Sequence, residues 1–130
     1  MAKKASTNPL RALALAPMAG FRSKVITVPE WENTSVKLRE PSGQAWLEWQ
    51  QIINPNPEGE PETLTAAERA LRNKSADVVL FIDVLLDEED MPVFTAEDKP
   101  LIENIYGPVH ARLLKQALDL STSQAAAEAK

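Results

Sequence analysis

Cysteine is absent from this chain of 130 residues, and histidine occurs once, as His110. Without a thiol, a disulfide, a thiolate metal site and a cysteine nucleophile are all excluded. A single imidazole also excludes metal sites that need two histidines. We therefore expect no cofactor.

The sequence also contains no pair of side chains spaced for acid–base catalysis. Asp77 and Asp83 lie six residues apart and would project from different faces of a helix, so they do not form an acid–base pair. His110 has no serine or cysteine nucleophile close to it in the sequence, and the favoured interpretation is a partly buried packing residue. We expect a protein that is not an enzyme.

Long apolar runs are missing as well. No stretch approaches the ~20 residues of a membrane span. Lys3 and Lys4 precede an apolar segment, Leu10–Ala16, but Arg11 interrupts it and Pro17 ends it, which leaves it too short for a signal peptide. We expect a soluble, intracellular protein.

The net charge of -5 argues against general nucleic-acid binding, but the charge is unevenly placed. Basic residues gather at the N-terminus. The favoured interpretation of this basic segment is a solvated arm, and a nucleic-acid-binding regulator remains an alternative. The basic residues that precede the first acid, Glu30, are Lys3, Lys4, Arg11, Arg22 and Lys24.

The acidic run Asp87–Asp90 resembles the start of a calcium loop. An EF-hand requires glycine at its sixth position and a bidentate glutamate at its twelfth, where this chain has Pro92 and Asp98. The run therefore predicts a solvated turn, and we expect no metal site.

The densest apolar segment is Ala76–Leu86, and its β-branched residues would also suit a strand. Thr65 and Glu68 form a capping box upstream, and no glycine or proline lies between Thr65 and Asp90. The pattern predicts one central core helix from about Thr65 to Leu86.

Shorter elements surround this helix. Alternation predicts strands over 21–28 and 35–39, and capping signals predict helices over 44–53, from Thr95 to Tyr106, and over 109–120. The fold class is therefore α+β and predominantly helical, with a small N-terminal β element followed by about four to five helices packed around the central apolar helix. We expect a flexible basic arm over 1–20, a single globular domain over 21–120 and a flexible Ala-rich tail over 121–130.

Trp46 and Trp49 lie three residues apart on one face of the predicted 44–53 helix. Core packing is the favoured interpretation, and an aromatic docking surface is the alternative. On the central helix, Val79 and Leu86 spread beyond a single apolar stripe. The favoured interpretation is a helix buried on most sides in the core, and the alternative is that one flank contacts another protein chain, as a self-associating protein would need. The candidate protein-interaction residues are Trp46, Trp49, Val79 and Leu86.

Three segments occur in a recognisable order: Val36-Lys-Leu-Arg-Glu-Pro-Ser-Gly43 before the Trp-bearing helix, then the apolar Val78–Asp87, then Val93-Phe-Thr-Ala-Glu-Asp98. In this order the chain, from about Phe21 to Leu120, resembles the tail assembly chaperones of lambda-like bacteriophages with long, noncontractile tails. It departs from such sequences in the acidic turn, where Met91 and Pro92 replace the usual glycine.

The resemblance implies a non-enzymatic chaperone in the host cytoplasm during phage assembly. Such a protein binds the long helical tape-measure protein, keeps it soluble, helps to recruit tail tube subunits through a frameshift-extended form, and then leaves, so it is not expected in the mature virion. Many copies would be needed for each tape measure, which suggests self-association, helical or spiral. The alternatives are a structural head-tail or tail component retained in the virion and the nucleic-acid-binding regulator.

Overall fold

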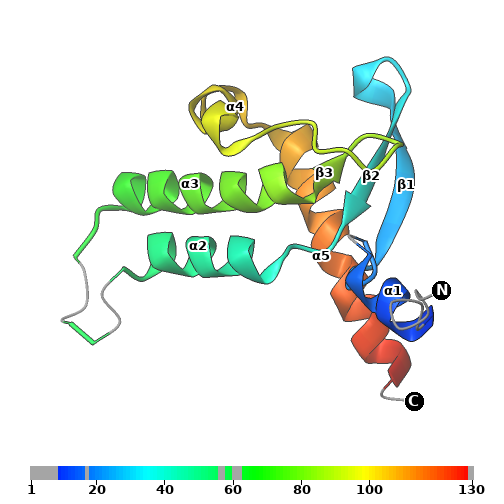
Figure 1. Ribbon diagram of the computed structural model, residues 1–130. Helices are drawn as coiled ribbons and strands as arrows, with labels where there is room; N and C mark the ends of the chain where they lie inside the picture. The colour runs from blue at the N-terminus through cyan, green and yellow to red at the C-terminus, as the bar shows by residue number, and fades with distance from the viewer. Residues whose placement is uncertain (1–8, 17, 56–57, 60–62, 129–130) are drawn as a thin grey trace.

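A computed structural model describes residues 9–16, 18–55, 58–59 and 63–128. It confirms the predicted fold class, since the described residues form helices and one small antiparallel sheet (Figure 1). The α-helices are α1 (Pro9–Leu15), α2 (Gly43–Ile53), α3 (Ala66–Val84), α4 (Lys99–Ile105) and α5 (Pro108–Glu128), the strands are β1 (Ser23–Val28), β2 (Thr34–Arg39) and β3 (Leu85–Leu86), and the 3-10 helices are η2 (Pro29–Trp31) and η3 (Ala96–Asp98).

The sheet has the order β1-β2-β3, with both pairs antiparallel. Strand β1 pairs with β2 along its full length, from Ser23 opposite Arg39 to Val28 opposite Thr34. The third strand, in which Leu86 lies opposite Lys37, was not predicted from the sequence.

The central helix begins as predicted and ends earlier. Thr65 Oγ1 accepts the Glu68 N–H at 3.1 Å, and a Glu68 carboxylate oxygen accepts the Thr65 N–H at 2.9 Å, so the capping box is confirmed. The helix was expected to continue to Leu86, but it ends at Val84 because Leu85 turns into extended backbone with φ -89° and ψ 120°. Leu85 and Leu86 instead pair with the free edge of β2, where both side chains are buried.

Helix α3 is the centre of the core, as predicted. It lies between α2 and α4, and its C-terminal end meets the sheet and α5 (Figure 1). The largest fully buried side chain is Phe81 of α3. Around it the core contains Val28, Val36, Leu38, Ala45, Val78, Leu80, Val84, Leu85, Ile102, Leu113, Leu114 and Ala117.

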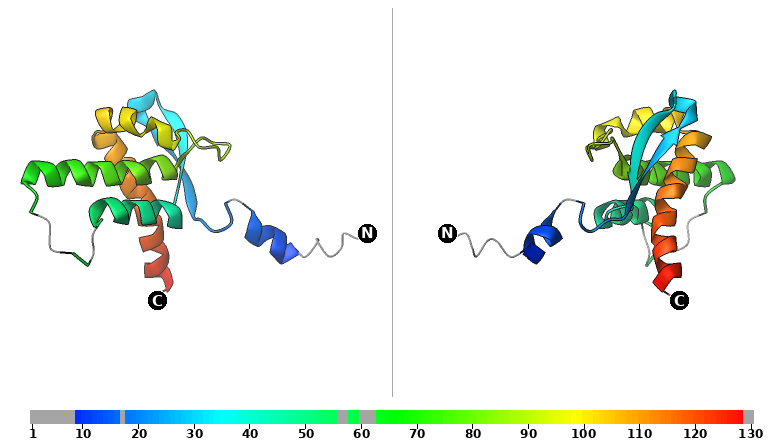
Figure 2. Two further views of the ribbon diagram at one scale, coloured as in Figure 1. Left: turned by 60° about the vertical axis from the view of Figure 1, so that its left-hand side comes forward. Right: turned by 90° about the vertical axis from the view of Figure 1, so that its right-hand side faces the viewer.

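The two ends of the chain carry more helix than the sequence pattern indicated. Helix α5 continues to Glu128, although its apolar stripe ends near Leu120 and a tail was expected from residue 121. The basic arm contains α1, which stands apart from the helices of the core (Figure 2). Residues 1–8 of the arm lie outside the described residues, and the flexibility of both ends stays a prediction.

Candidate functional site

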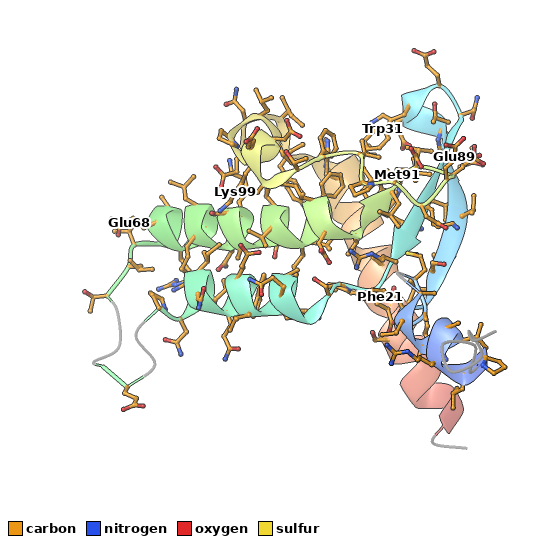
Figure 3. All side chains as sticks on the ribbon, viewed as in Figure 1. Phe21, Trp31, Glu68, Glu89, Met91 and Lys99 are labelled. Carbon is orange, nitrogen blue, oxygen red and sulfur yellow. The ribbon has the colours of Figure 1, made fainter. Side chains whose placement is uncertain are left out.

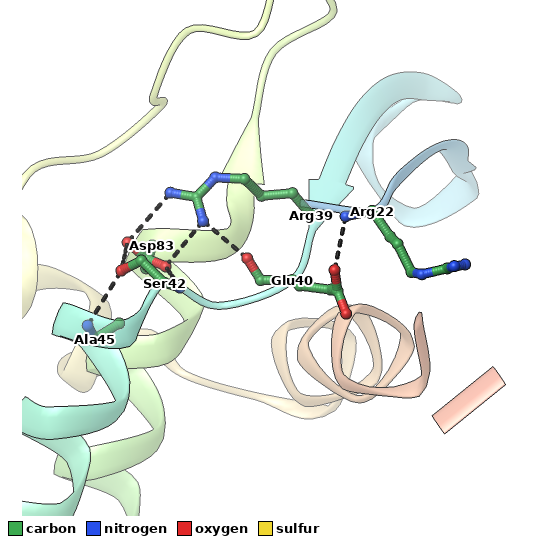
Figure 4. A network of polar contacts seen from close by, with 6 residues as sticks. All are labelled: Arg22, Arg39, Glu40, Ser42, Ala45 and Asp83. Atoms are coloured by element: carbon green, nitrogen blue, oxygen red, sulfur yellow. Dashed lines mark hydrogen bonds and ion pairs between the residues drawn. The ribbon is translucent and has the colours of Figure 1, made fainter. Parts of the chain in front are cut away.

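The segment from Arg39 to Gly43 joins the sheet to α2 and fixes both to α3 (Figure 4). Arg39 donates two hydrogen bonds to the Asp83 carboxylate, from Nη1 at 3.1 Å and from Nη2 at 3.3 Å. The Ser42 backbone N–H donates to the same carboxylate at 2.7 Å. Ser42 Oγ also accepts the Ala45 N–H at 3.1 Å, which caps the first turn of α2. This segment therefore holds the sheet, α2 and α3 together. The Asp83 carboxylate of α3 is the acceptor of these hydrogen bonds.

Glu40 holds the start of β1 on the other side of the same junction. Its carboxylate accepts the Arg22 backbone N–H at 2.7 Å, and a hydrogen bond from Ser121 of α5 is the main cause that lowers the pKa of Glu40. The Arg39 guanidinium lies 4.2 Å from the centre of the Phe21 ring, where a cation–π contact forms. Phe21 thus anchors the chain just before β1 (Figure 3).

A groove of about 580 Å³ runs over α3 between α2 on one side and the η3–α4 segment on the other. Its floor is apolar, with Val79 and Ile82 of α3 between Ile52 of α2 and Phe94. Polar side chains lie along its edges. The lining residues are Arg39, Gln44, Ala45, Glu48, Gln51, Ile52, Val79, Ile82, Asp83, Pro92, Phe94, Thr95, Ala96 and Lys99, and we call this surface the groove.

A second surface, which we call the tryptophan face, consists of Trp46, Leu47 and Trp49 on α2. Trp46 and Trp49 pack edge to face, with ring centres 5.5 Å apart. Trp49 Nε1 donates to an Asp77 carboxylate oxygen at 3.3 Å, and burial raises the pKa of Asp77. Trp46 and Leu47 remain 40% and 50% exposed. Trp49 is therefore tied to α3, as the core-packing interpretation expected, and Trp46 is partly exposed, as an aromatic docking surface would require.

The structure does not bring the four candidate interaction residues together. Val79 lines the groove, whereas Trp46 and Trp49 lie on the tryptophan face and neither of them lines the groove. Leu86 is 3% exposed, and as a buried residue of β3 it offers no surface to a partner. Ile52, Ile82 and Phe94, which complete the groove, were not singled out from the sequence.

The acidic run forms the predicted turn. Asp87 Oδ1 accepts the N–H groups of Glu89 and Met91 at 2.8 and 3.0 Å, and Asp90 adopts a positive φ of 68°. Asp90 pairs with Lys37 of β2 at 2.5 Å. Within the described ranges, no group of three or more His, Asp or Glu side chains is placed to hold a metal ion.

His110 belongs to an aromatic cluster over Phe81. Its ring centre lies 5.3 Å from that of Phe81, 5.5 Å from Tyr106 and 5.6 Å from Trp31. His110 Nδ1 accepts the Gly107 N–H at 3.0 Å, and burial lowers the pKa of the imidazole. The neutral ring therefore packs the start of α5 against α3, as the sequence interpretation expected.

In the part of the chain that the structure describes, no helix combines the length and apolarity needed to cross a membrane.

Comparison with known proteins identifies relatives of this chain. The family model described as phage tail assembly chaperone matches residues 9–130. A solved structure, the tail assembly chaperone of bacteriophage HK97, is similar with 54% sequence identity and a TM-score of 0.75, covering 88% of this chain and 98% of that chain. A search of curated protein sequences gives no match.

Proposed function

Because the chain belongs to the phage tail assembly chaperone family, we propose that it binds the tape-measure protein of its phage and keeps that protein soluble until the tail tube forms. It then leaves the assembled tail. The family is one of assembly chaperones, and the residues described above hold the fold together without forming a catalytic arrangement.

The observation that carries this proposal is the number of large apolar side chains that this small protein exposes to solvent. A monomer that stays alone in solution rarely exposes large apolar patches. In the described residues, the large apolar side chains that are 40% or more exposed are Leu10, Leu13, Leu15, Val25, Trp46, Leu47, Leu71, Met91, Val93, Leu101 and Ile105.

The tryptophan face is the surface that we assign to the tape measure. An amphipathic helix presents its apolar stripe to a partner, and Trp is the side chain most enriched among residues that carry binding energy. Trp46 is held in one orientation by Trp49, which is itself fixed by Asp77, so little side-chain entropy is lost when a partner covers the ring. Leu47, the next residue of α2, is 50% exposed and adds a second apolar side chain to the surface of this helix.

Two further steps complete the proposed role. Copies of the chaperone associate with one another along the tape measure, in a helical or spiral arrangement, and a frameshift-extended form recruits tail tube subunits. The C-terminal end of α5 points away from α2, α3 and α4 (Figure 1), which would place the added residues of such a form clear of the tryptophan face.

We place this activity in the host cytoplasm during assembly. A structural component retained in the virion is the second candidate, and mass spectrometry of purified particles distinguishes the two, since a chaperone is absent from them. A nucleic-acid-binding regulator would show salt-sensitive DNA binding, because phosphate contacts release counterions. The acidic body of this chain disfavours that alternative.

The direct test is co-expression with the tape-measure protein encoded by the same genome. We expect the tape measure to move from the insoluble to the soluble fraction and to elute together with many copies of the chaperone. A tape measure that stays insoluble and unbound at matched expression would contradict the proposal.

A further inference from the structure

We propose that α1 of one copy docks its leucines into the groove of a second copy, so that the copies join head to tail. The inference rests on the self-association proposed above and names the two surfaces that produce it. It uses neither Trp46 nor Trp49, so each copy keeps its tryptophan face available for the tape measure.

Helix α1 has the character of a docking segment. None of its residues is buried, and Leu10, Leu13 and Leu15 are 72%, 66% and 66% exposed. Leu10 and Leu13 lie three residues apart, so they share one face of the helix. Figure 2 shows that α1 stands off from the core, where a second molecule can reach it.

The groove has the shape and chemistry to receive this helix. Its volume of about 580 Å³ falls within the ~300–1,000 Å³ of pockets that bury most of a ligand. Val79 and Ile82 form an apolar floor, and α2 and η3 flank it as two walls. An apolar helix face laid into such a channel is a common mode of recognition between proteins.

Charge also favours this pairing. Five of the fourteen basic residues precede the first acid, which leaves nine basic and nineteen acidic residues in the rest of the chain. Glu48 lies on the groove edge, and the two cations of the lining are already paired, Arg39 with Asp83 at 3.1 Å and Lys99 with Glu103 at 3.8 Å. The basic arm of one copy is therefore attracted to the acidic body of the next.

The connection between α1 and β1 explains why the groove belongs to a second copy. Phe21 is held against Arg39, and residues 18–20 are folded into a turn, with the Ala19 N–H donating to Ala16 O at 3.0 Å and the Phe21 N–H donating to Met18 O at 3.2 Å. Figures 1 and 2 show α1 outside the layer formed by α2, α3 and α4. A contact between two different surfaces on successive copies is heterologous, so it can extend along the tape measure.

Site-specific crosslinking tests the docking, and the absence of native cysteine gives a clean background. Leu13→Cys and Ile52→Cys single variants, one of them carrying a mass tag, are mixed and treated with a short bismaleimide. We expect the mixed covalent dimer to form several-fold more than in a matched mixture of Leu13→Cys with Thr27→Cys, whose thiol lies exposed on β1. Equal yields from the two mixtures would overturn the proposal.

The double variant Leu13→Cys/Ile52→Cys distinguishes docking of α1 into a second copy from docking of α1 into the groove of its own chain. Docking into a second copy produces a ladder of covalent multimers. A product confined to internally crosslinked monomer would show that α1 fills its own groove and would overturn the proposal.

Sedimentation velocity provides a test without engineered thiols. The Leu13→Glu variant is expected to sediment as the 14.3 kDa monomer at concentrations where the wild type associates, while Leu101→Glu, the same change on exposed α4, keeps the wild-type distribution. Unchanged association of Leu13→Glu would overturn the proposal. The tape-measure co-expression test uses the wild-type chain and is scored by solubility, so failure of this docking is distinguishable from failure of the proposed function.

Discussion

Arg39 and Asp83, which are 44 residues apart in the sequence, form a two-pronged ion pair that joins the end of β2 to α3. The same carboxylate accepts hydrogen bonds from the backbone N–H and the hydroxyl of Ser42. Four donors therefore converge on one largely buried carboxylate, at the point where the sheet, α2 and α3 meet (Figure 4).

Removing the carboxylate at this junction should destabilise the fold. Asp83→Ala leaves the Arg39 guanidinium and the Ser42 N–H without their partner, and we expect a loss of about 2–3 kcal/mol in the free energy of unfolding. Urea denaturation followed by circular dichroism measures it. Asp119→Ala, which breaks only the exposed Lys115–Asp119 pair, is the control and should cost less than about 0.5 kcal/mol. Equal effects of the two substitutions would contradict the role given to Asp83.

Phe81 should be the most sensitive position of the core. It is 0% exposed and touches Phe94, Tyr106 and His110, so Phe81→Ala leaves a cavity that its neighbours fill only in part. We expect a loss of about 3–5 kcal/mol in the free energy of unfolding. Leu71→Ala on the same helix, where Leu71 is 61% exposed, should change it by less than about 0.5 kcal/mol. A mild effect at Phe81 would place the centre of the core elsewhere.

Acidification should weaken the packing around His110. Burial lowers the pKa of the imidazole below its ordinary 6.5, so between the two pKa values the unfolded chain binds more protons than the folded one. Stability from this group is present above pH 6.5 and is lost as the pH falls through the folded pKa. NMR titration of the single histidine should give a midpoint below 6.5. A midpoint at or above 6.5 would show that the ring is not buried as a neutral group.

A bidentate pair between Glu30 of η2 and Arg112 of α5 should keep Glu30 ionised in acid. Both hydrogen bonds are 2.8 Å, and the bond from Arg112 is the main cause that lowers the pKa of Glu30 from 4.5 to about 2. Stability from this pair is present above pH 4.5 and is lost as the pH falls towards 2. In Arg112→Met, carboxylate NMR should show the pKa of Glu30 rising towards 4.5, while a value unchanged from wild type would mean that the pair does not form in solution.

Local signals in the sequence predicted most of the secondary structure. The Thr65–Glu68 capping box and the alternation of Val36 and Leu38 depend on residues close in the chain, so they fixed the start of α3 and the course of β2 correctly. The departure of Leu85 and Leu86 into β3 was not predicted, because it depends on the free edge of β2, about fifty residues upstream.

The candidate interaction surfaces were harder to predict from the sequence than the secondary structure. Trp46 and Trp49 were singled out because their spacing is helical, and they do share a face. The groove escaped prediction, since Ile52, Val79 and Phe94 come from three separate segments and only the packing of α2 and α4 against α3 brings them together. Asp83 offered one signal, as a charged residue inside an apolar run.

The most direct test of the central claim is the solubility of the tape measure when it is co-expressed with variants of the tryptophan face. Trp46→Glu and Leu47→Glu place a charge where an apolar stripe should bind, and Leu101→Glu on α4 is the matched control; unfolding midpoints confirm that all three variants are folded. We predict that the soluble tape measure falls to the level seen without chaperone for Trp46→Glu and Leu47→Glu and stays at the wild-type level for Leu101→Glu. Full solubility with folded Trp46→Glu and Leu47→Glu would contradict the account.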